Sequence, residues 1–444
     1  MRCGRSSRSP PAQRSFSRPR SRVVHSSSEH LLKSPYRALI PERLGRNFQW
    51  IWSSSSVSNL GDGVVLAAGP LLVASITTEP FAVAMTMFAQ RVPWFLFGLW
   101  SGAVVDRVDR QRLLVLVDLL RAAVLAALVA TVALDLVNLP VIYVTMFLLG
   151  SAETLVDNAG TALLVTAVPR EFLGPANARL YGAMMLTNQL VGPPLGALLF
   201  AAGAAYPFGF NAVCFVIAAA LIARVVLERR ERPRAEPSPV RRQVLEGLRW
   251  LWAHAAVRTL AIMIAAFNIT FGAAFSIWVL YARERLGLDE FGFGLLLAAT
   301  AVGGVIGSAL FGALEKRFSY ATLLRAGLIL ETMTHLILAL NRSPYVAGIV
   351  MVMFGAHAII WGTSSTTVRQ RSVPDTLMGR VNSVYMIGMM GSLALGTLLG
   401  GAIASRWGVI APFWFAFIGS AMILLATWRA IGYVTHEVEV PAGS

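Results

Sequence analysis

Cysteine and lysine are almost missing from this chain of 444 residues, which has two of each. Cys3 lies in a polar stretch and Cys214 in an apolar run, so a framework of disulfides is excluded and redox chemistry is not expected. Neither lysine completes a GxxxxGK[ST] phosphate loop. The six histidines have no metal-ligand or HExxH spacing. We therefore expect neither an enzyme nor a bound metal or cofactor.

Charged residues are also scarce, at 14% of the chain, whereas 56% of the residues are hydrophobic and the mean hydropathy is +0.63. A soluble domain cannot bury so much apolar surface, so the composition predicts an integral membrane protein. The net charge of +15 does not indicate nucleic-acid binding. Eleven basic and two acidic residues before Gln49 account for +9 of it, and most of the rest lies in short breaks between apolar runs.

Apolar runs separated by short polar breaks predict twelve membrane spans of roughly 20 residues or more. The breaks after the first, third and fifth spans contain no Lys or Arg, whereas those after the second, fourth and sixth are rich in Arg. The second group, together with both termini, is therefore expected in the cytoplasm. In the second half, Arg283, Arg285, Arg342 and Arg406 depart from this rule. The expected spans are 50–76, 81–102, 113–135, 140–164, 177–201, 206–227, 257–281, 289–312, 320–340, 345–368, 378–404 and 409–431.

The span limits predict five regions: a basic tail at 1–47, a lobe at 48–227, a linker at 228–256, a second lobe at 257–432 and a tail at 433–444. The first tail is rich in Ser, Pro and Arg, so we expect it to be disordered and cytoplasmic. Its composition also fits a transit peptide or an over-extended start. Within the linker, apolar residues recur at helical spacing from Val240 to Trp252 and predict an amphipathic helix on the inner membrane surface.

The two halves of the chain repeat one another. At an offset of 205, seven first-half residues, including Gly150 and Gly196, align with identical residues of the second half, including Gly355 and Gly401. At an offset of 210, GAVVDRVDRQRLL returns as GALEKRFSYATLL with its acidic core altered. Such symmetry across a basic linker is typical of a transporter with its site between two lobes. The predicted fold is an all-α integral membrane protein with twelve transmembrane helices in two pseudo-symmetric six-helix lobes.

Two motifs carry a family resemblance. GAVVDRVDRQR, from Gly102 to Arg112, is similar to the signature loop of the major facilitator superfamily, and GPPLG, from Gly192 to Gly196, is similar to the helix-five motif of its proton-coupled antiporters. The chain resembles this superfamily across residues 48–432. Residues 58–63, 91–102 and 169–177 resemble the branch with enterobactin exporters and macrolide efflux pumps. The resemblance implies that helices one, four, seven and ten line a central cavity.

The signature loop is a candidate gate. A carboxylate at Asp106 could face the N-terminal turn of another helix, and the resemblance supplies one, the start of span eleven near Met378 to Arg380. The alternative is an ordinary positive-inside turn. The loop residues that we assign to gating are Gly102, Asp106, Arg107, Arg110 and Arg112.

The antiporter motif combines small residues with two prolines. Gly192 and Gly196 allow a neighbouring helix to approach closely, and Pro193 and Pro194 remove backbone donors. A kinked, close-packed interface of this kind could limit leak while the lobes rock. Ordinary packing of small residues is the alternative.

Ionisable residues inside the spans cost roughly 2.5–3.5 kcal/mol each on insertion scales and are therefore functional candidates. Asp62, Arg91 and Glu153 fall at one depth near mid-bilayer, which predicts a shared network. In it, one carboxylate would bind a proton while Arg91 neutralises the other. Asp157 lies on the same helical face as Glu153. The alternative is that these charges only hold the first lobe together.

Other polar residues within the spans have weaker assignments. Asp118 and Arg121 can pair along one helix, and we favour a structural role for them, whereas His357 could shuttle protons or simply pack. Glu331 and His335 are four residues apart in span nine. Polar, aromatic and Met side chains would suit an amphipathic cargo in the cavity. They are Ser55, Ser58, Asn59, Asn268, Tyr385, Met386 and Met389.

These features predict a proton-coupled exporter of small amphipathic molecules, such as drugs, macrolides or siderophores, that works by alternating access. A nutrient or metabolite importer on the same fold is the alternative, and the GPPLG motif argues against it. The expected partners are a small-molecule substrate, protons and membrane lipid, without nucleic acid, and the protein is expected to be a monomer. We expect it in the plasma membrane of a bacterium, because Arg and Ala are strongly preferred over Lys.

Overall fold

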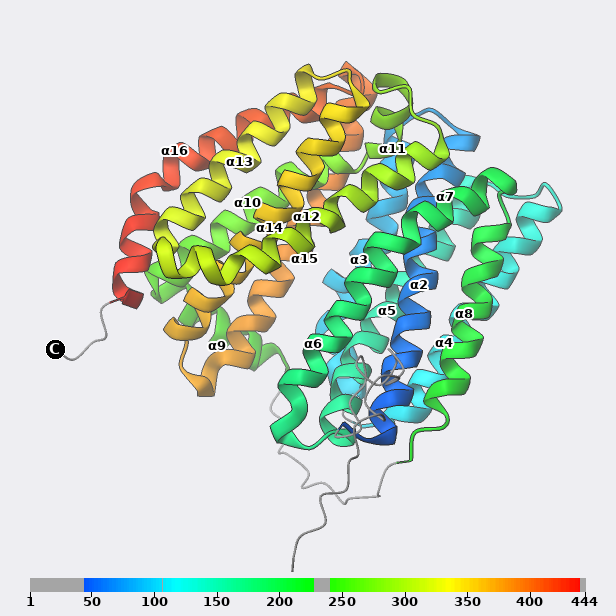
Figure 1. Cartoon of the computed structure of the whole chain (residues 1–444), viewed down its shortest axis with the longest axis horizontal. Helices are drawn as coiled ribbons and strands as arrows, with labels where there is room; N and C mark the ends of the chain where they lie inside the picture. The colour runs from blue at the N-terminus through cyan, green and yellow to red at the C-terminus, as the bar shows by residue number, and fades with distance from the viewer. Residues whose placement is uncertain (1–43, 106, 227–239, 440–444) are drawn as a thin grey trace, which may run out of the picture. The chain divides into compact units, whose positions relative to one another are not determined.

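The computed structural model describes residues 44–105, 107–226 and 240–439, and within these ranges the chain forms helices and no strand (Figure 1). Ten helical segments of this part are long and apolar enough to cross a membrane. They lie at ten of the predicted positions, which confirms an all-helical membrane protein. At the two other positions lie α3 (Pro80–Val105) and α8 (Tyr206–Ile222), and α8 has 17 residues.

The first half begins with α2 (Gly45–Ile76), and α3 follows after a short break. Side-chain caps start the next two helices: Asp109 accepts a hydrogen bond from the Arg112 N–H, and Asn138 accepts one from the Val141 N–H. A 3₁₀ turn, η2 (Arg170–Phe172), precedes the fifth predicted span, and a π-helix, η3 (Met185–Val191), interrupts it. The remaining first-half helices are α4 (Arg110–Ala133), α5 (Leu139–Ala167), α6 (Leu173–Met184) and α7 (Gly192–Ala202).

The second half has the same order of long helices. Asp289 and Ser319 cap two of them by accepting hydrogen bonds from the Gly292 and Thr322 N–H groups. A second π-helix, η4 (Tyr281–Arg285), ends the seventh predicted span after the short α11 (Trp278–Leu280). The others are α9 (Val240–Ala253), α10 (Ala255–Phe275), α12 (Glu290–Arg317), α13 (Tyr320–Leu340), α14 (Pro344–Ser372), α15 (Asp375–Trp407) and α16 (Ala411–Glu439).

Helix packing follows the internal repeat. In the first half α2 packs on α7 and α8, and α3 on α5; in the second half α10 packs on α15 and α16, and α12 on α14. Contacts of α3 with α15 and of α7 with α12 join the two halves. The aligned glycines Gly150 and Gly355 have equivalent places. A Cβ on Gly150 would lie 2.1 Å from the Gln90 carbonyl oxygen, and one on Gly355 would lie 1.9 Å from that of Thr300.

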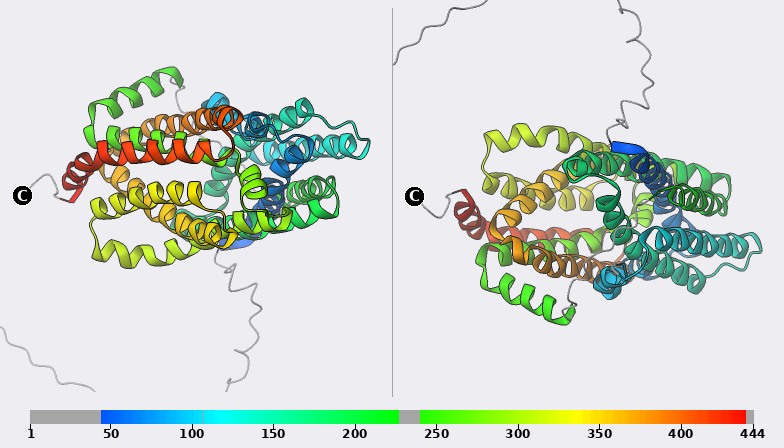
Figure 2. Two further views of the ribbon diagram at one scale, coloured as in Figure 1. Left: turned by 90° about the horizontal axis from the view of Figure 1, so that it is seen from above. Right: turned by 90° about the horizontal axis from the view of Figure 1, so that it is seen from below.

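The amphipathic segment of the linker is helical in the structure, as α9, and it packs on α15 and α10 (Figure 2). Leu251 is buried, whereas Leu245, Leu248 and Trp252 are exposed. Two arginines hold Glu246: Arg242 Nε lies 3.0 Å and Arg380 Nη1 lies 2.7 Å from its carboxylate oxygens. The linker helix is therefore fixed to the start of α15. Three stretches of the predicted regions lie outside the described part. They are residues 1–43 of the N-terminal tail, residues 227–239 at the start of the linker, and the C-terminal tail from residue 440.

Candidate functional site

A buried arginine organises the charges of the first half. Arg121 of α4 donates from Nη2 to both carboxylate oxygens of Asp62 on α2, at 2.9 and 3.1 Å. Its Nη1 lies 3.6 Å from Oδ1 of Asp118, one turn earlier on α4. The guanidinium stands 4.0 Å above the ring of Phe215, and the Arg121 side chain is 3% exposed. Asp62, at 32% exposed, is the member of this cluster that remains reachable.

Two acidic residues of α5 complete this network. Glu153 and Asp157 lie within electrostatic range of Arg121, and Arg91 lies within range of Asp157. The structure thus brings the predicted charges together, but the cation that pairs with Asp62 is Arg121, not Arg91. The Nε of Arg91 is buried without a hydrogen-bond partner in the described part of the chain. Sequence position predicts a depth for each charge but not the direction in which its helix presents it.

A cavity of about 530 Å³ with both polar and apolar wall residues lies beside this network. Asn59, one of the α2 residues predicted to suit an amphipathic cargo, lies on its wall and donates to the Ser55 carbonyl at 2.8 Å. Asp118 and Asp157 reach the same cavity from α4 and α5. Its wall also includes Ser54, Ser55, Ser58, Gly160, Thr161, Asn177 and Tyr181.

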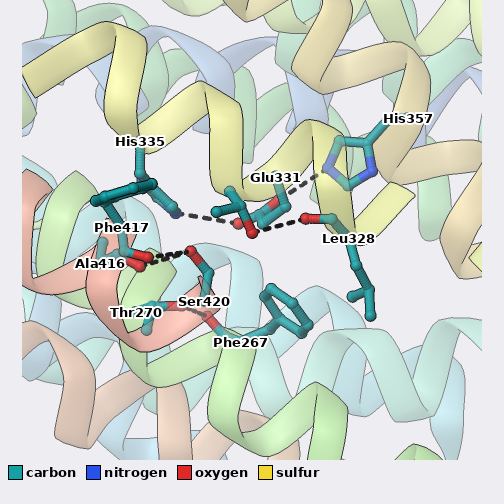
Figure 3. Close-up of polar contacts among 10 residues, drawn as sticks. Phe267, Thr270, Leu328, Glu331, His335, His357, Ala416, Phe417 and Ser420 are labelled. Atoms are coloured by element: carbon teal, nitrogen blue, oxygen red, sulfur yellow. Dashed lines mark hydrogen bonds and ion pairs between the residues drawn. The ribbon is translucent and has the colours of Figure 1, made fainter. Parts of the chain in front are cut away.

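A second buried cluster joins α13 to α14. Glu331 bridges two histidines: His335 Nε2 lies 3.2 Å from Oε1, and His357 Nε2 lies 2.8 Å from Oε2 (Figure 3). The exposed fractions of the three residues are 6%, 0% and 9%. His357 is therefore not a lone packing histidine but part of a three-residue cluster.

A cavity of about 450 Å³ borders this cluster. Glu331 and His357 form part of its wall, and so does Asn268, whose Nδ2 donates to the Ile264 carbonyl at 2.7 Å. Half of the remaining wall residues are aromatic or methionine, as the sequence predicts for an amphipathic cargo. These residues are Phe267, Phe271, Phe354, Trp361, Tyr385, Met386 and Met389.

The signature loop is attached to its own half. Arg110 Nη1 donates to the Ala162 carbonyl of α5 at 3.0 Å, and Gln111 Nε2 donates to the Val225 carbonyl at 2.7 Å. Arg107 and Arg112 are exposed, and Gly102 lies within α3. Asp106 lies outside the described residues, so its expected contact with the start of α15 remains a prediction.

The antiporter motif lies where three helices meet. Added Cβ atoms on Gly192 and Gly196 would come within 2.6 Å of Gly63 Cα and 2.1 Å of the Val64 carbonyl oxygen, so the backbones of α7 and α2 touch. On its other side, a Cβ on Gly294 of α12 would lie 2.8 Å from the Pro193 carbonyl oxygen and 3.0 Å from Pro194 Cα. The predicted close approach is present, and it involves both halves.

Two features of the site could not be predicted from the sequence. The four-residue spacing of Glu331 and His335 was visible, but the link to His357 depends on α13 packing beside α14. Likewise, nothing in the sequence indicates that Arg121 turns toward α2. In both cases the missing information is which helices are neighbours and which faces they share.

Comparisons with known proteins identify a family and several transporters that the chain resembles. A model of the transmembrane secretion effector family matches residues 38–443. Over 375 residues the chain is 29% identical to the multidrug efflux pump Tap of Mycolicibacterium fortuitum, covering 80% of this chain and 88% of the relative. Over 395 residues it is 24% identical to the enterobactin exporter EntS of Shigella boydii serotype 18, covering 85% and 91%.

Solved structures share the fold at low sequence identity. The nucleoside transporter NupG superposes with a TM-score of 0.71 at 9% identity, covering 87% of this chain and 99% of that one. A bacterial homologue of the iron transporter ferroportin, in an inward-facing state, superposes with a TM-score of 0.66 at 16% identity, covering 88% and 98%. At these identities the likeness establishes the arrangement of helices and not the cargo.

Proposed function

We propose that this chain, which belongs to the transmembrane secretion effector family of major facilitator transporters, is a proton-coupled exporter of small amphipathic molecules in a bacterial plasma membrane. Its relatives include a multidrug efflux pump and an enterobactin exporter, which supports drugs or siderophores as cargo. It is a transporter and not an enzyme. Export, and not import, is the direction that we assign to it.

Alternating access requires two bodies that rock about a shared interface. The separate packing of α2 to α8 and of α10 to α16 supports two such lobes. The junctions of α3 with α15 and of α7 with α12 would then be the surfaces that slide. GPPLG contacts α2 and α12 at once, so it is placed to keep this interface closed to ions while it moves.

The observation that carries the proton coupling is the ion pair between Asp62 and Arg121. Arg121 is shared by two carboxylates, one partly exposed and one buried. A proton that binds to Asp62 would remove its charge and leave Arg121 to Asp118. Because Asp62 is on α2 and Asp118 on α4, that exchange would loosen one helix from another and so couple protonation to movement.

Everted membrane vesicles under an imposed pH gradient test this function. We expect Asp62→Asn and Glu153→Gln to abolish pH-driven efflux of a drug or siderophore without affecting membrane insertion. Asp135→Asn is the matched control, since Asp135 is exposed in the break after α4 and should be dispensable. Full pH-driven transport by the Asp62 and Glu153 variants would overturn the proton site, and cargo flux only in the opposite direction would indicate an importer.

A further inference from the structure

The cluster of Glu331, His335 and His357 has an unusual hydrogen-bond pattern. Each carboxylate oxygen of Glu331 contacts the Nε2 atom of a different histidine. If the carboxylate is ionised, both Nε2 atoms must carry the hydrogen that they donate. Two neutral imidazoles then solvate the carboxylate without neutralising it, and the cluster has a net charge of −1.

The outer nitrogens of the two imidazoles limit where a further proton can go. Nδ1 of His335 and Nδ1 of His357 are both buried, and neither has a hydrogen-bond partner within the described residues. An imidazolium would bury an N–H group there without an acceptor, which is unfavourable. One added proton is therefore best accepted by a free lone pair of the Glu331 carboxylate, directed away from the two Nε2–H groups, and it brings the cluster to a net charge of zero.

Among the described residues of the cavity wall, Arg369 is the one fixed cation, and it lies away from the cluster. Apart from Glu331, the other polar residues of this wall are Asn268 of α10, Tyr385 of α15, and His357, Ser365 and Thr366 of α14. The Arg369 guanidinium stacks on the Tyr385 ring at 4.0 Å. Arg369 is also twelve residues beyond His357, about 18 Å along α14 at 1.5 Å per residue.

The fourth neighbour, α16, brings a neutral group. Its Ser420 hydroxyl donates to the backbone carbonyls of Ala416 and Phe417 (Figure 3). The carboxylate thus lies at the wall of a cavity that five aromatic side chains also line, Phe267, Phe271, Phe354, Trp361 and Tyr385. Aromatic faces attract organic cations, and the cavity volume falls within the ~300–1,000 Å³ that is typical of small-molecule sites.

We propose that this second-half cavity binds an organic cation with an apolar or aromatic body, and that the Glu331 cluster accepts either that cation or one proton. The inference rests on the proposed proton-coupled export and adds to it a cargo class and a second proton site. When the proton binds at Glu331, the negative charge that holds the cargo disappears and the cation is released. When the proton leaves, the cation can bind again.

Equilibrium binding to the purified full-length chain tests this without any transport. The probes are tetraphenylphosphonium and tetraphenylborate, which have four phenyl rings each and opposite charge, measured by titration calorimetry in detergent. We expect the cation to bind at least tenfold more tightly than the anion. Its apparent Kd should rise by up to about tenfold for each unit that the pH falls through the range where the cluster titrates. Equal affinity, tighter binding of the anion, or cation binding independent of pH would overturn the proposal.

Variants locate the effect. Glu331→Gln should remove both the preference for the cation and its pH dependence, while neutral triphenylphosphine oxide should bind as in the wild type and so report an intact cavity. An unchanged cation preference in this variant would contradict the inference. Asp62→Asn should lose pH-driven transport but retain pH-dependent cation binding. Full pH-driven transport by Asp62→Asn with intact cation binding would therefore count against the proposed function and not against this site.

Discussion

Arg121 holds carboxylates from two helices while its own side chain is almost completely buried. A buried cation in such a position is tolerated because its partners and the Phe215 ring replace water around it. Removing the cation alone would leave its carboxylate partners uncompensated. Asp118, 3% exposed, would be left as an unpaired charge in an apolar setting.

Arg121→Met should therefore destabilise the protein by about 3 kcal/mol, at the low end of the range for broken buried ion pairs because Asp62 is partly exposed. The free energy of unfolding in mixed detergent micelles measures this. Arg317→Met is the control, because Arg317 is exposed at the end of α12 and should change stability little. A cost as small as that of the control would show that Arg121 is not needed to neutralise Asp62 and Asp118.

Glu79 lies in the break between α2 and α3 and shows the opposite electrostatic situation. Partial burial would raise the pKa of its carboxyl, but hydrogen bonds from the Ser405 hydroxyl and the Ala82 and Phe81 N–H groups outweigh burial and lower it. A lowered pKa in the folded state adds stability above the unfolded pKa of about 4.3, and this stability is lost as the pH falls below it.

Glu79→Gln should thus be less stable than the wild type at pH 6, and the difference should shrink as the pH falls from about 4.3 toward 3. Unfolding midpoints across this pH range measure it. Ser405→Ala should reproduce part of the loss, since its hydroxyl donates to Glu79. A difference that is constant with pH would mean that the Glu79 contact does not depend on its charge.

At the scale of helices, glycine placement decides how closely the elements pack. Gly355 and Gly348 lie seven residues apart on α14 but differ in their surroundings. A Cβ on Gly355 would lie 1.9 Å from the Thr300 carbonyl oxygen of α12, whereas one on Gly348 would meet nothing within 4 Å. The same chemical change should therefore have opposite effects at the two positions.

Gly355→Ala should destabilise the protein by about 1–3 kcal/mol, because α12 must move away. Gly348→Ala should be neutral or stabilising by up to about 1 kcal/mol, because alanine favours helix over glycine. Unfolding in mixed micelles compares the two. Equal effects would mean that α12 and α14 adjust to a methyl group at no cost.

The two copies of the signature loop offer a second test at this scale. We expect Asp106→Asn to cripple transport, because the acidic arrangement of its loop is intact. In the second copy, Glu315 accepts a hydrogen bond from the neighbouring Tyr320 hydroxyl, so Glu315→Gln should be tolerated. Transport rates in vesicles measure both. Equal losses would reduce GAVVDRVDRQR to a signal of topology.

At the scale of the whole chain, contacts at one end of the helices connect the two halves. Arg283 Nη1 of η4 donates to the Ala74 carbonyl of α2 at 3.1 Å, and Arg283 Nη2 pairs with Glu290 at 2.8 Å. Glu79 and Ser405 form another such link near the ends of α2 and α15. We expect these contacts to hold the two halves together at this end.

Arg283→Ala should shift the population toward a state that is open at this end. Spin labels on Thr78→Cys and Arg406→Cys, both exposed, would report a longer distance. Arg342→Ala, at a nearby exposed site, is the control and should leave the distance unchanged. An unchanged distance in Arg283→Ala would mean that the Arg283 contacts do not hold this end closed.

Sequence alone predicted the family and the positions of the helices, because apolar runs of membrane length and two short motifs can be recognised without knowing which helices are neighbours. The comparisons confirm the resemblance. The sequence could not predict that Arg121 pairs with Asp62, or that His357 completes a cluster with Glu331. Both contacts depend on which faces of separate helices pack against each other. It also missed η3 and η4, because a π-helix differs from an α-helix by one residue and not by composition.

The one extra residue in the π-helix η3 has a further consequence. The π-helix η3 widens one turn just before GPPLG, and the Asn188 backbone in that turn lies against Gly63 of α2. Deleting one residue between Met185 and Val191 would restore a regular α-helix and turn everything before it by about 100° relative to α7. The helices α6 and α7 could then not keep their present contacts at the same time. A one-residue length difference, and not the motif itself, keeps both contacts compatible.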